Sequence, residues 1–401
     1  MDNKNTPLLE RDEFDLSDIL SPEELAEIEL AAEAEVQYVS KAEAPDDTAD
    51  ISEAYEYAPE APELPAPEKG VKSPGIFGII ARVLSFVLAT VVLILCGALG
   101  VVYMMSRGPS ESARDLFVLS LRETSAAGFV AGIFLSDEEI ALIEEANKPD
   151  DILDSVDTSL ISIAAKGGEE LSPGEVADAK DIEILDVVGG TFNGKMMIVS
   201  DPERIVVGVS NQLGAAGQTL VDMIASYGGV GGVNAGGFED LNGTGNGGIP
   251  DGIVIHEGKL LYGANVRAAT AVIDYDGILH VGNMTGNEAM ELNAEWAVSF
   301  GPVLVVNGEK CDGLSSGLNP RTAIGQRSDG AILLLVINGR QVGSMGATYE
   351  DVADVMLSFG AVNALNLDGG SSSSMIYEGE FLNISSSLVG QRALPTGIIV
   401  R

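Results

Sequence analysis

The residues most able to carry chemistry lie at the end of a short apolar run, where the sequence changes to Asp-Gly-Gly followed by four serines. The apolar run predicts a buried strand, and Asp368 is the first residue after it. Because glycine has no Cβ, a ligand can approach the backbone closely at Gly369 and Gly370. Asp368 is therefore a candidate acid or base, and Gly369, Gly370 and Ser371 form a candidate cradle for an anion. The alternative is an ordinary Asp-Gly turn with a serine tail.

A second copy of this pattern favours the chemical interpretation. Without a gap, residues 220–238 align with residues 352–370, and each copy predicts a helix, a glycine stop and a short strand. Asn234 falls on Asn366, and both close a predicted strand before a glycine-rich break. We interpret the two copies as a structural pseudo-repeat that could bring both asparagines to one site.

Three further groups of polar residues and glycines follow predicted strands or lie in predicted turns. Gly236 and Gly237 come directly after the first asparagine, and Asp251 lies in a Pro-Asp-Gly turn, where a plain turn role is the alternative. Arg321 and Thr322 open a strand after Asn-Pro. A guanidinium beside glycine amides suits a phosphate or a sugar acid, whereas a surface salt bridge is an equally weighted alternative for Arg321.

Several other metal-binding and nucleophile motifs are absent from the sequence. The sequence has no Cys/His zinc pattern, no His-Glu-x-x-His helix, no Gly-x-Ser-x-Gly elbow and no phosphate-binding loop ending in Gly-Lys-Ser/Thr. No cofactor is therefore required, and the metal site, if any, is unknown. The polar residues named above are compatible with a bound divalent cation.

The secondary-structure elements that must position these candidate site residues are mostly strands. From residue 181 onward, short β runs alternate with Gly turns such as Glu257-Gly258, Asp276-Gly277 and Asn307-Gly308, which predict hairpins. Two helices are expected, near residues 218–226 and 349–359, with Thr348 as the N-cap of the second. The predicted fold class is α+β, with a strand-rich, mixed or antiparallel sheet and a few packed helices.

The first 70 residues form an acidic arm. They hold 21 acidic and 4 basic side chains of a chain whose formal net charge is −39. Such a composition cannot bury enough apolar surface to fold, so residues 1–70 are expected to be disordered. A chain this acidic would repel the phosphates of nucleic acid, so no nucleic-acid partner is expected.

One membrane helix is predicted after the arm. The sequence carries no charge from Val83 to Met105, which is long enough to cross a bilayer core of about 30 Å. We assign residues 75–106 to a transmembrane helix, residues 108–180 to a helical connector and spacer without functional residues, and residues 181–401 to the globular domain. The basic residues flanking the span are nearly balanced, and we place the arm in the cytoplasm and the domain outside.

Residues 181–401 resemble the phosphodiester glycosidase family. The resemblance rests on the order and spacing of five segments: residues 233–238, 301–304, 319–325, 366–371 and 392–397. One departure is Glu239, which stands where the family often has a second aromatic residue. The resemblance implies a hydrolase that cleaves a sugar-1-phosphodiester, such as an N-acetylglucosamine phosphodiester, in bacterial envelope or exported polysaccharide. The catalytic set would be Asp368, Arg321 and Asn234.

The resemblance also suggests roles for these residues. Arg321 and the amides of Gly369 and Gly370 would hold the phosphate, Asp368 would stabilise the oxocarbenium ion or activate water, and the two asparagines would hold sugar hydroxyls. The alternative is a membrane-tethered, non-catalytic module that binds polysaccharide or assists exopolysaccharide assembly.

Overall fold

The structure is a computed structural model that describes residues 76–124, 127–153, 156–163, 181–240, 245–384, 386 and 390–401. The expected disordered arm (1–70) and the part of the expected spacer between 164 and 180 lie outside the described residues.

The largest sheet has seven antiparallel strands, and its strand order differs from the chain order because distant segments pair side by side. In spatial order the strands are β1 (Ile182–Val188), β2 (Asn193–Val199), β15 (Ile332–Ile337), β14 (Arg321–Arg327), β16 (Ala361–Leu367), β12 (Val303–Val306) and β13 (Glu309–Lys310). Every residue of β15 and β16 is buried, as expected for strands covered on both faces.

Two five-stranded antiparallel sheets and one two-stranded ladder complete the strands of the described residues. The first has the order β10 (Leu279–Thr285), β9 (Arg267–Asp274), β11 (Ala294–Ser299), β7 (Val254–His256) and β8 (Lys259–Tyr262). The second has the order β18 (Glu380–Phe381), β17 (Met375–Tyr377), β4 (Gly231–Asn234), β19 (Thr396–Val400) and β3 (Ile205–Val209). The ladder joins β5 (Gly237–Phe238) to β6 (Pro250–Asp251).

The three larger sheets share one apolar core. Side chains from each of them, including Val233, Trp296 and Leu365, belong to a single buried cluster, and all three are at most 2% exposed. Burial of this apolar surface is the main stabilising contribution to such a fold. The core holds the ends of β4, β14 and β16 close together, and these strand ends carry the site described below.

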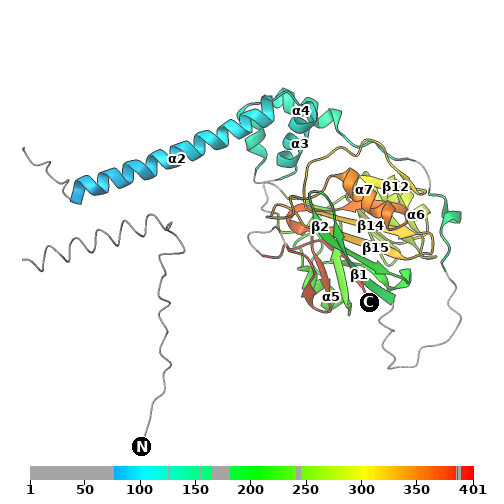
Figure 1. Cartoon of the computed structure of the whole chain (residues 1–401). Helices are drawn as coiled ribbons and strands as arrows, with labels where there is room; N and C mark the ends of the chain where they lie inside the picture. Colours follow the sequence, from blue (N-terminus) through cyan, green and yellow to red (C-terminus); the bar gives the residue numbers. More distant parts are fainter. Residues whose placement is uncertain are drawn as a thin grey trace, which may run out of the picture. The chain divides into compact units, whose positions relative to one another are not determined.

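Helices cover the outer faces of the sheets. Figure 1 shows α7 (Tyr349–Ser358) lying against the sheet that contains β12 and β14, where Met356 packs into a second apolar cluster. Thr348 caps α7 with a capping box. Helix α5 (Leu220–Ser226) packs on β4 and β19, and α6 (Gly286–Glu291) packs on β10 and β11. The short 3-10 helices are η2 (Gly128–Ile133), η3 (Thr158–Leu160), η5 (Pro202–Arg204) and η7 (Gly370–Ser372).

The predicted α+β class is confirmed. Hairpins predicted at Glu257-Gly258, Asp276-Gly277 and Asn307-Gly308 are the ladders β7–β8, β9–β10 and β12–β13. In each turn the glycine has a positive φ, between 68° and 82°, a conformation that glycine adopts without strain. The pseudo-repeat is also present as helix and strand in both copies, α5–β4 and α7–β16.

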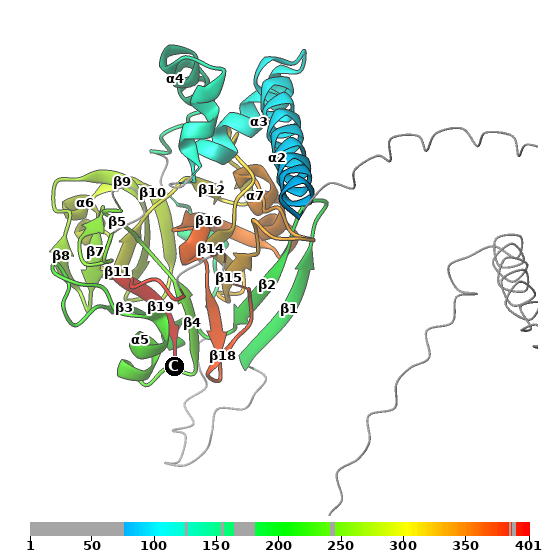
Figure 2. The same ribbon diagram turned by 90° about the vertical axis from the view of Figure 1, so that its left-hand side faces the viewer.

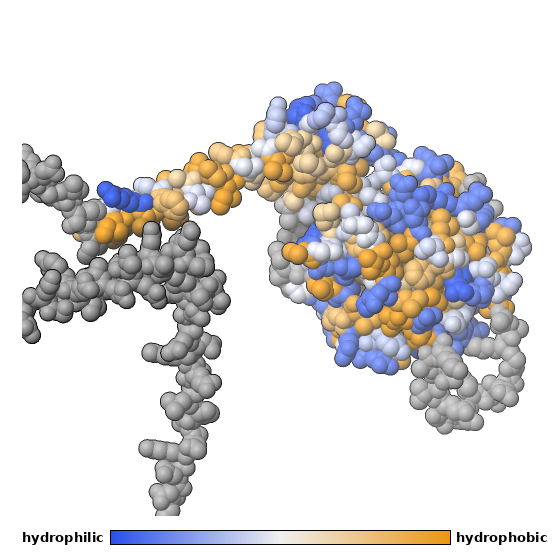
Figure 3. All heavy atoms as spheres, in the orientation of Figure 1, coloured by the Kyte–Doolittle hydropathy of each residue, from blue (hydrophilic) through white to orange (hydrophobic). Residues whose placement is uncertain are grey.

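Among the described residues, three α-helices precede the strands. Helix α2 (Ile76–Arg107) contains the predicted span, and it is the helix among the described residues that is long and apolar enough to cross a membrane. Figure 3 shows apolar side chains along its length. Helices α3 (Glu111–Arg122) and α4 (Asp137–Ala146) form a small core of their own with η2. Ser136 caps α4 with a capping box, a local pattern completed by Glu139 three residues later.

Candidate active site

Asp368 is carried by the end of β16. Its backbone N–H donates to the carbonyl of Ala235 at 2.9 Å, so the ends of β4 and β16 meet here. The chain then turns through Gly370, whose φ of 61° lies in the left-handed region, into η7. Backbone pairing on one side and this turn on the other fix the direction of the Asp368 side chain.

The carboxyl group of Asp368 has an unusual environment. Its Oδ2 is buried and has no hydrogen-bond partner among the described residues. Burial raises its pKa to about 7, although a hydrogen bond from the Ser372 side chain and one from the Gly369 amide lower it. A carboxyl with a pKa near neutrality can exchange a proton during a reaction, so Asp368 has the properties of an acid or base.

Asn234 lies behind Asp368 and is fully buried. Its Nδ2 donates to the backbone carbonyl of Asp368, while its Oδ1 accepts from the Thr322 hydroxyl at 2.8 Å and from the Ser374 amide at 3.0 Å. The side chain therefore ties β4, β14 and the serine run together. These contacts favour a positioning role for Asn234 over the sugar contact expected from the sequence.

Arg321 opens β14 and is 3% exposed. Its Nε donates to the carbonyl of Ala347 at 3.0 Å, and its Nη2 donates to the carbonyl of Gly317 and to the carboxylate of Glu123, both at 2.7 Å. The guanidinium carbon lies 4.1 Å from the ring centroid of Tyr349. Arg321 is thus held rigidly, and its charge is already paired with a carboxylate of the same chain.

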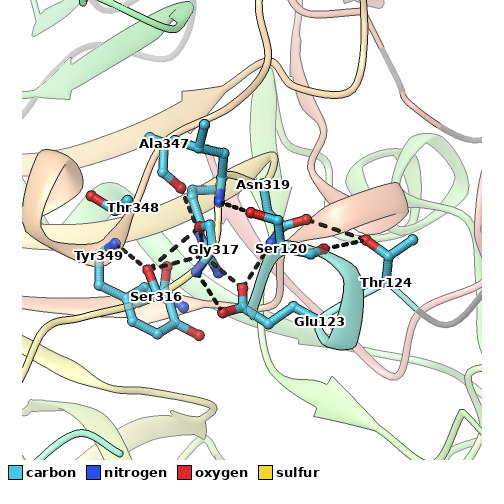
Figure 4. A network of polar contacts seen from close by, with 12 residues as sticks. Ser120, Glu123, Thr124, Ser316, Gly317, Asn319, Ala347, Thr348 and Tyr349 are labelled. Atoms are coloured by element: carbon cyan, nitrogen blue, oxygen red, sulfur yellow. Dashed lines mark hydrogen bonds and ion pairs between the residues drawn. The ribbon is translucent and has the colours of Figure 1, made fainter. Parts of the chain in front are cut away.

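Glu123 comes from the end of α3, within the connector for which no functional residue was expected. In Figure 4 its carboxylate faces Gly317 and Asn319, and it accepts from the Gly317 amide at 3.0 Å and from Asn319 Nδ2 at 2.8 Å. Ser120, one turn earlier, accepts from the Leu318 amide at 2.8 Å. The connector therefore docks on the domain and contributes a carboxylate to the site. No motif marks this glutamate among the 61 acidic residues of the chain.

Arg340 is a second guanidinium that the sequence analysis did not identify. Its backbone has a φ of 57°, which a non-glycine residue rarely adopts. Both Nε and Nη2 donate to Asn319 Oδ1, at 3.2 and 2.7 Å, and Nη1 lies 3.4 Å from the place where a Cβ on Gly370 would stand. Among the described residues Arg340 has no carboxylate within ion-pair distance, so its charge is open to a ligand.

These groups surround one cavity of about 260 Å³. Its walls include seven of the residues predicted from the sequence: Arg321, Asp368, Gly237, Asp251, Gly369, Gly370 and Ser371. They also include Glu123, Phe238, Asp240, Phe300, Asn319, Arg340, Tyr349 and Ser372. The structure therefore brings the Asp-Gly-Gly turn, Arg321 and the Pro-Asp-Gly turn to a single site.

Four predicted residues lie behind this cavity and do not line it. They are Asn234, described above, and Thr322, Asn366 and Gly236. Thr322 donates to Asn234, Asn366 Nδ2 donates to the carbonyls of Gly301 and Leu367, and the Gly236 amide donates to the Thr396 hydroxyl. Their contacts support the cavity wall from within the fold.

Aromatic rings give the cavity an apolar side. Phe300 is 41% exposed, and Arg392 lies over the ring of Phe238 with its guanidinium carbon 5.1 Å from the centroid. Such rings, combined with a few polar groups, are typical of pockets that bind small organic ligands.

Within the described part of the chain, no three His, Cys, Asp or Glu side chains are grouped as they would be to hold a metal ion.

Residues 227–401 match the sequence model of the phosphodiester glycosidase family, which confirms the resemblance over that stretch. A segment of 78 residues is 41% identical to the SPbeta prophage-derived uncharacterized protein YomE of Bacillus subtilis (strain 168). That segment covers 20% of this chain and 12% of YomE, so the chain matches only a small part of that relative's length.

Two solved structures are similar in part. The catalytic domain of zebrafish N-acetylglucosamine-1-phosphodiester alpha-N-acetylglucosaminidase, auto-inhibited by its pro-peptide, is 22% identical with a TM-score of 0.46, over 55% of this chain and 82% of that one. A hypothetical protein from Synechocystis is 17% identical with a TM-score of 0.45, over 55% of this chain and 61% of that one.

Proposed function

We propose that this chain is a hydrolase that cleaves a sugar-1-phosphodiester, because residues 227–401 match the sequence model of the phosphodiester glycosidase family. The observation that supports the proposal most directly is the shared cavity. Asp368, with a buried and unpartnered carboxyl oxygen, lines the same walls as the guanidinium groups of Arg321 and Arg340. A proton-exchanging carboxyl beside an unpaired cation suits a substrate that joins a sugar to an anion.

The reaction would break the bond between C1 of the sugar and its phosphate oxygen. The electron pair of that bond stays on the phosphate, which is a good leaving group, so the developing charge at C1 is positive. The Asp368 carboxylate stabilises that charge or accepts a proton from the attacking water. The oxygen of that water bonds to C1, and the products are a free sugar and a phosphate monoester.

The surrounding residues would hold the two halves of the substrate. Arg340 lines the wall on which a phosphate oxygen can receive hydrogen bonds. The amides of Gly369 and Gly370 already donate, to the Asp368 carboxyl group and to the carbonyl of Pro320, so these glycines would allow close approach of the phosphate to the backbone instead of giving it the hydrogen bonds expected from the sequence. Arg321, whose charge is paired with Glu123, contributes to the field at the same wall. Phe300 offers an exposed ring face to the apolar side of a sugar.

The proposed location of the reaction depends on α2. We propose that this helix anchors the chain in the cell membrane as a single span, with the acidic arm in the cytoplasm and the domain outside. The substrate would then be a phosphodiester in bacterial envelope material or exported polysaccharide. The composition of α2, with no charged residue from Val83 to Met105, supports the anchor.

The test is hydrolysis by the full chain in detergent. It would be incubated with a panel of sugar-1-phosphodiesters, including an N-acetylglucosamine-1-phosphodiester, and the release of reducing sugar would be measured. We expect release by the natural chain, loss of release in Asp368→Asn and normal release in the control Asp276→Asn, whose side chain is exposed. If no member of the panel is hydrolysed although the chain binds polysaccharide, the chain is a non-catalytic binding module.

A further inference from the structure

The 3-10 helix η2 exposes apolar side chains although it belongs to a folded core. Its Ala131 is buried in the small core that η2 forms with α3 and α4, the two helices shown together in Figure 2. Phe129 and Ile133 of the same helix are 74% and 42% exposed. Apolar side chains that gather in one exposed segment are typical of a contact site for another protein or a membrane.

The segment around η2 has no charge of its own. No charged residue occurs in residues 124–136. Two cations approach its ends, and both are already paired: Arg107 with Glu139 at 2.6 Å, and Arg122 with Glu144 at 2.8 Å. A charged partner would therefore find little electrostatic attraction here, whereas a neutral apolar environment would suit the exposed side chains.

The same segment contacts the end of α2. The ring of Phe134, which directly follows η2, packs edge to face on the ring of Tyr103, with centroids 5.4 Å apart. Tyr103 lies near the end of the uncharged stretch of α2 from Val83 to Met105, where an aromatic side chain is typical of the boundary between bilayer and water. Since η2 has six residues, it is about 12 Å long, so all of it lies within reach of that boundary.

We propose that η2 is a second membrane contact, in which Phe129 and Ile133 insert among the lipid headgroups of the leaflet where α2 ends. The inference rests on the proposed anchoring by α2 and is independent of the proposed hydrolysis. The partner is a bilayer of neutral or zwitterionic lipid, because the segment is uncharged and the Phe134 ring continues the apolar surface of α2. Apolar side chains of interfacial helices are buried about 5–10 Å into the boundary between headgroups and acyl chains.

This contact would restrict how the candidate active site is oriented above the bilayer. Ser120 and Glu123 of the α3 region accept hydrogen bonds from the domain loop at residues 317–319. Because η2 packs in the same small core as α3, the membrane contact and the candidate active site belong to one folded unit. Two contacts with the bilayer, α2 and η2, leave that unit less freedom to tilt than α2 alone.

Quenching of tryptophan fluorescence by brominated lipid tests the inference. The full chain carrying Phe129→Trp would be reconstituted in phosphatidylcholine vesicles whose lipid is brominated either near the headgroup end or near the methyl end of the acyl chains. The natural Trp296 is buried in the domain core and gives a constant background. We expect the fluorescence added by Phe129→Trp to fall about twofold with bromine near the headgroup end, and much less with bromine near the methyl end.

Two further variants serve as controls. Leu95→Trp, at an exposed residue within α2, tests the anchor itself and should be quenched by bromine near the methyl end. Tyr275→Trp is the matched control for Phe129→Trp, because it also replaces an exposed aromatic residue. Tyr275 lies between Asp274 and Asp276 in the β9–β10 turn, so it should stay in water and remain unquenched.

Each outcome decides the inference. Ile133→Trp repeats the measurement at the other exposed position of η2, so the result does not depend on one variant. If Leu95→Trp is quenched and neither Phe129→Trp nor Ile133→Trp is, the anchor stands and the contact of η2 with lipid is refuted. Quenching of Tyr275→Trp as strong as that of Phe129→Trp would also refute a contact specific to η2. If Leu95→Trp is not quenched, the anchor and the inference fail together, while the proposed hydrolysis is unaffected.

Discussion

Asp368→Asn is expected to gain stability relative to the natural chain as the pH rises. Burial raises the pKa of Asp368 from 3.8 to about 7 in the folded chain. The unfolded chain binds fewer protons than the folded chain between these two values, so ionisation costs folding free energy there. The carboxyl's contribution to stability is complete below its unfolded pKa and is lost as the pH rises through 7. Asparagine does not ionise, so the free energy of unfolding of Asp368→Asn does not fall in this way.

The size of the effect follows from the pKa difference. The difference of about 3 between the folded and unfolded pKa values corresponds to about 4 kcal/mol of folding free energy once both states are ionised. About 1.5 kcal/mol of this is already lost at pH 5, so the variant should gain about 2.5 kcal/mol on the natural chain between pH 5 and pH 8. This is an upper value, because the cavity beside the carboxyl admits water, which screens the charge.

Trp296 provides the assay. It is the single tryptophan of the chain and is 2% exposed in the shared core, so its fluorescence reports unfolding of the domain. Urea denaturation of both full-length proteins in detergent at the two pH values gives the four free energies of unfolding. A difference between variant and natural chain that stays constant within about 0.5 kcal/mol would refute the burial argument. The same ionisation should raise kcat as the pH rises through 7, because the proposed mechanism uses the carboxylate.

Three other substitutions test the remaining groups. Asn234→Ala should lower the free energy of unfolding by about 3 kcal/mol, measured by urea denaturation, because it removes three buried hydrogen bonds. Glu123→Gln should cost about 2 kcal/mol in the same assay because it leaves the buried charge of Arg321 unpaired, whereas Glu144→Gln, which breaks an exposed pair with Arg122, should cost less than about 1 kcal/mol. Arg340→Met should raise KM for the phosphodiester about tenfold with little change in unfolding, measured by steady-state kinetics, and an unchanged KM would contradict the role of Arg340 in binding phosphate.

Much of the fold could be predicted because its signals are local. A Gly turn between two short β runs predicts a hairpin from adjacent residues alone, and the same holds for Thr348 and Ser136 as helix caps. The order of strands in the seven-stranded sheet has no such local signal. It depends on which distant apolar faces pack together, as when β2 pairs with β15 more than a hundred residues later.

The site was predictable to the extent that its residues follow strand ends. Asp368, Arg321 and the glycines of the turn were found because a polar group next to glycine at a strand end is visible in the sequence. Glu123 and Arg340 have no such signal, since neither lies in a motif and both reach the cavity through tertiary contacts, among them those with Asn319. The pseudo-repeat predicted one site for Asn234 and Asn366. Both side chains lie behind the cavity, and the sequence could not show that hydrogen bonds within the fold occupy their amide groups.

The charges around the cavity of the candidate active site bear on how product would leave. Arg321 is paired with Glu123, so Arg340 supplies the positive charge that has no carboxylate partner among the described residues. One open guanidinium matches the single negative charge of a phosphodiester. Hydrolysis yields a phosphate monoester, which carries about two charges at neutral pH. Near this cavity the described residues offer the second charge no second open guanidinium, because Arg392, which lies over Phe238, is paired with Asp240 at 2.9 Å. Charge attraction would therefore not offset the cost of desolvating a doubly charged monoester, and product would bind more weakly than substrate. By pairing with Arg321, the glutamate supplied by the connector would thereby favour turnover, since an enzyme gains nothing by holding its product.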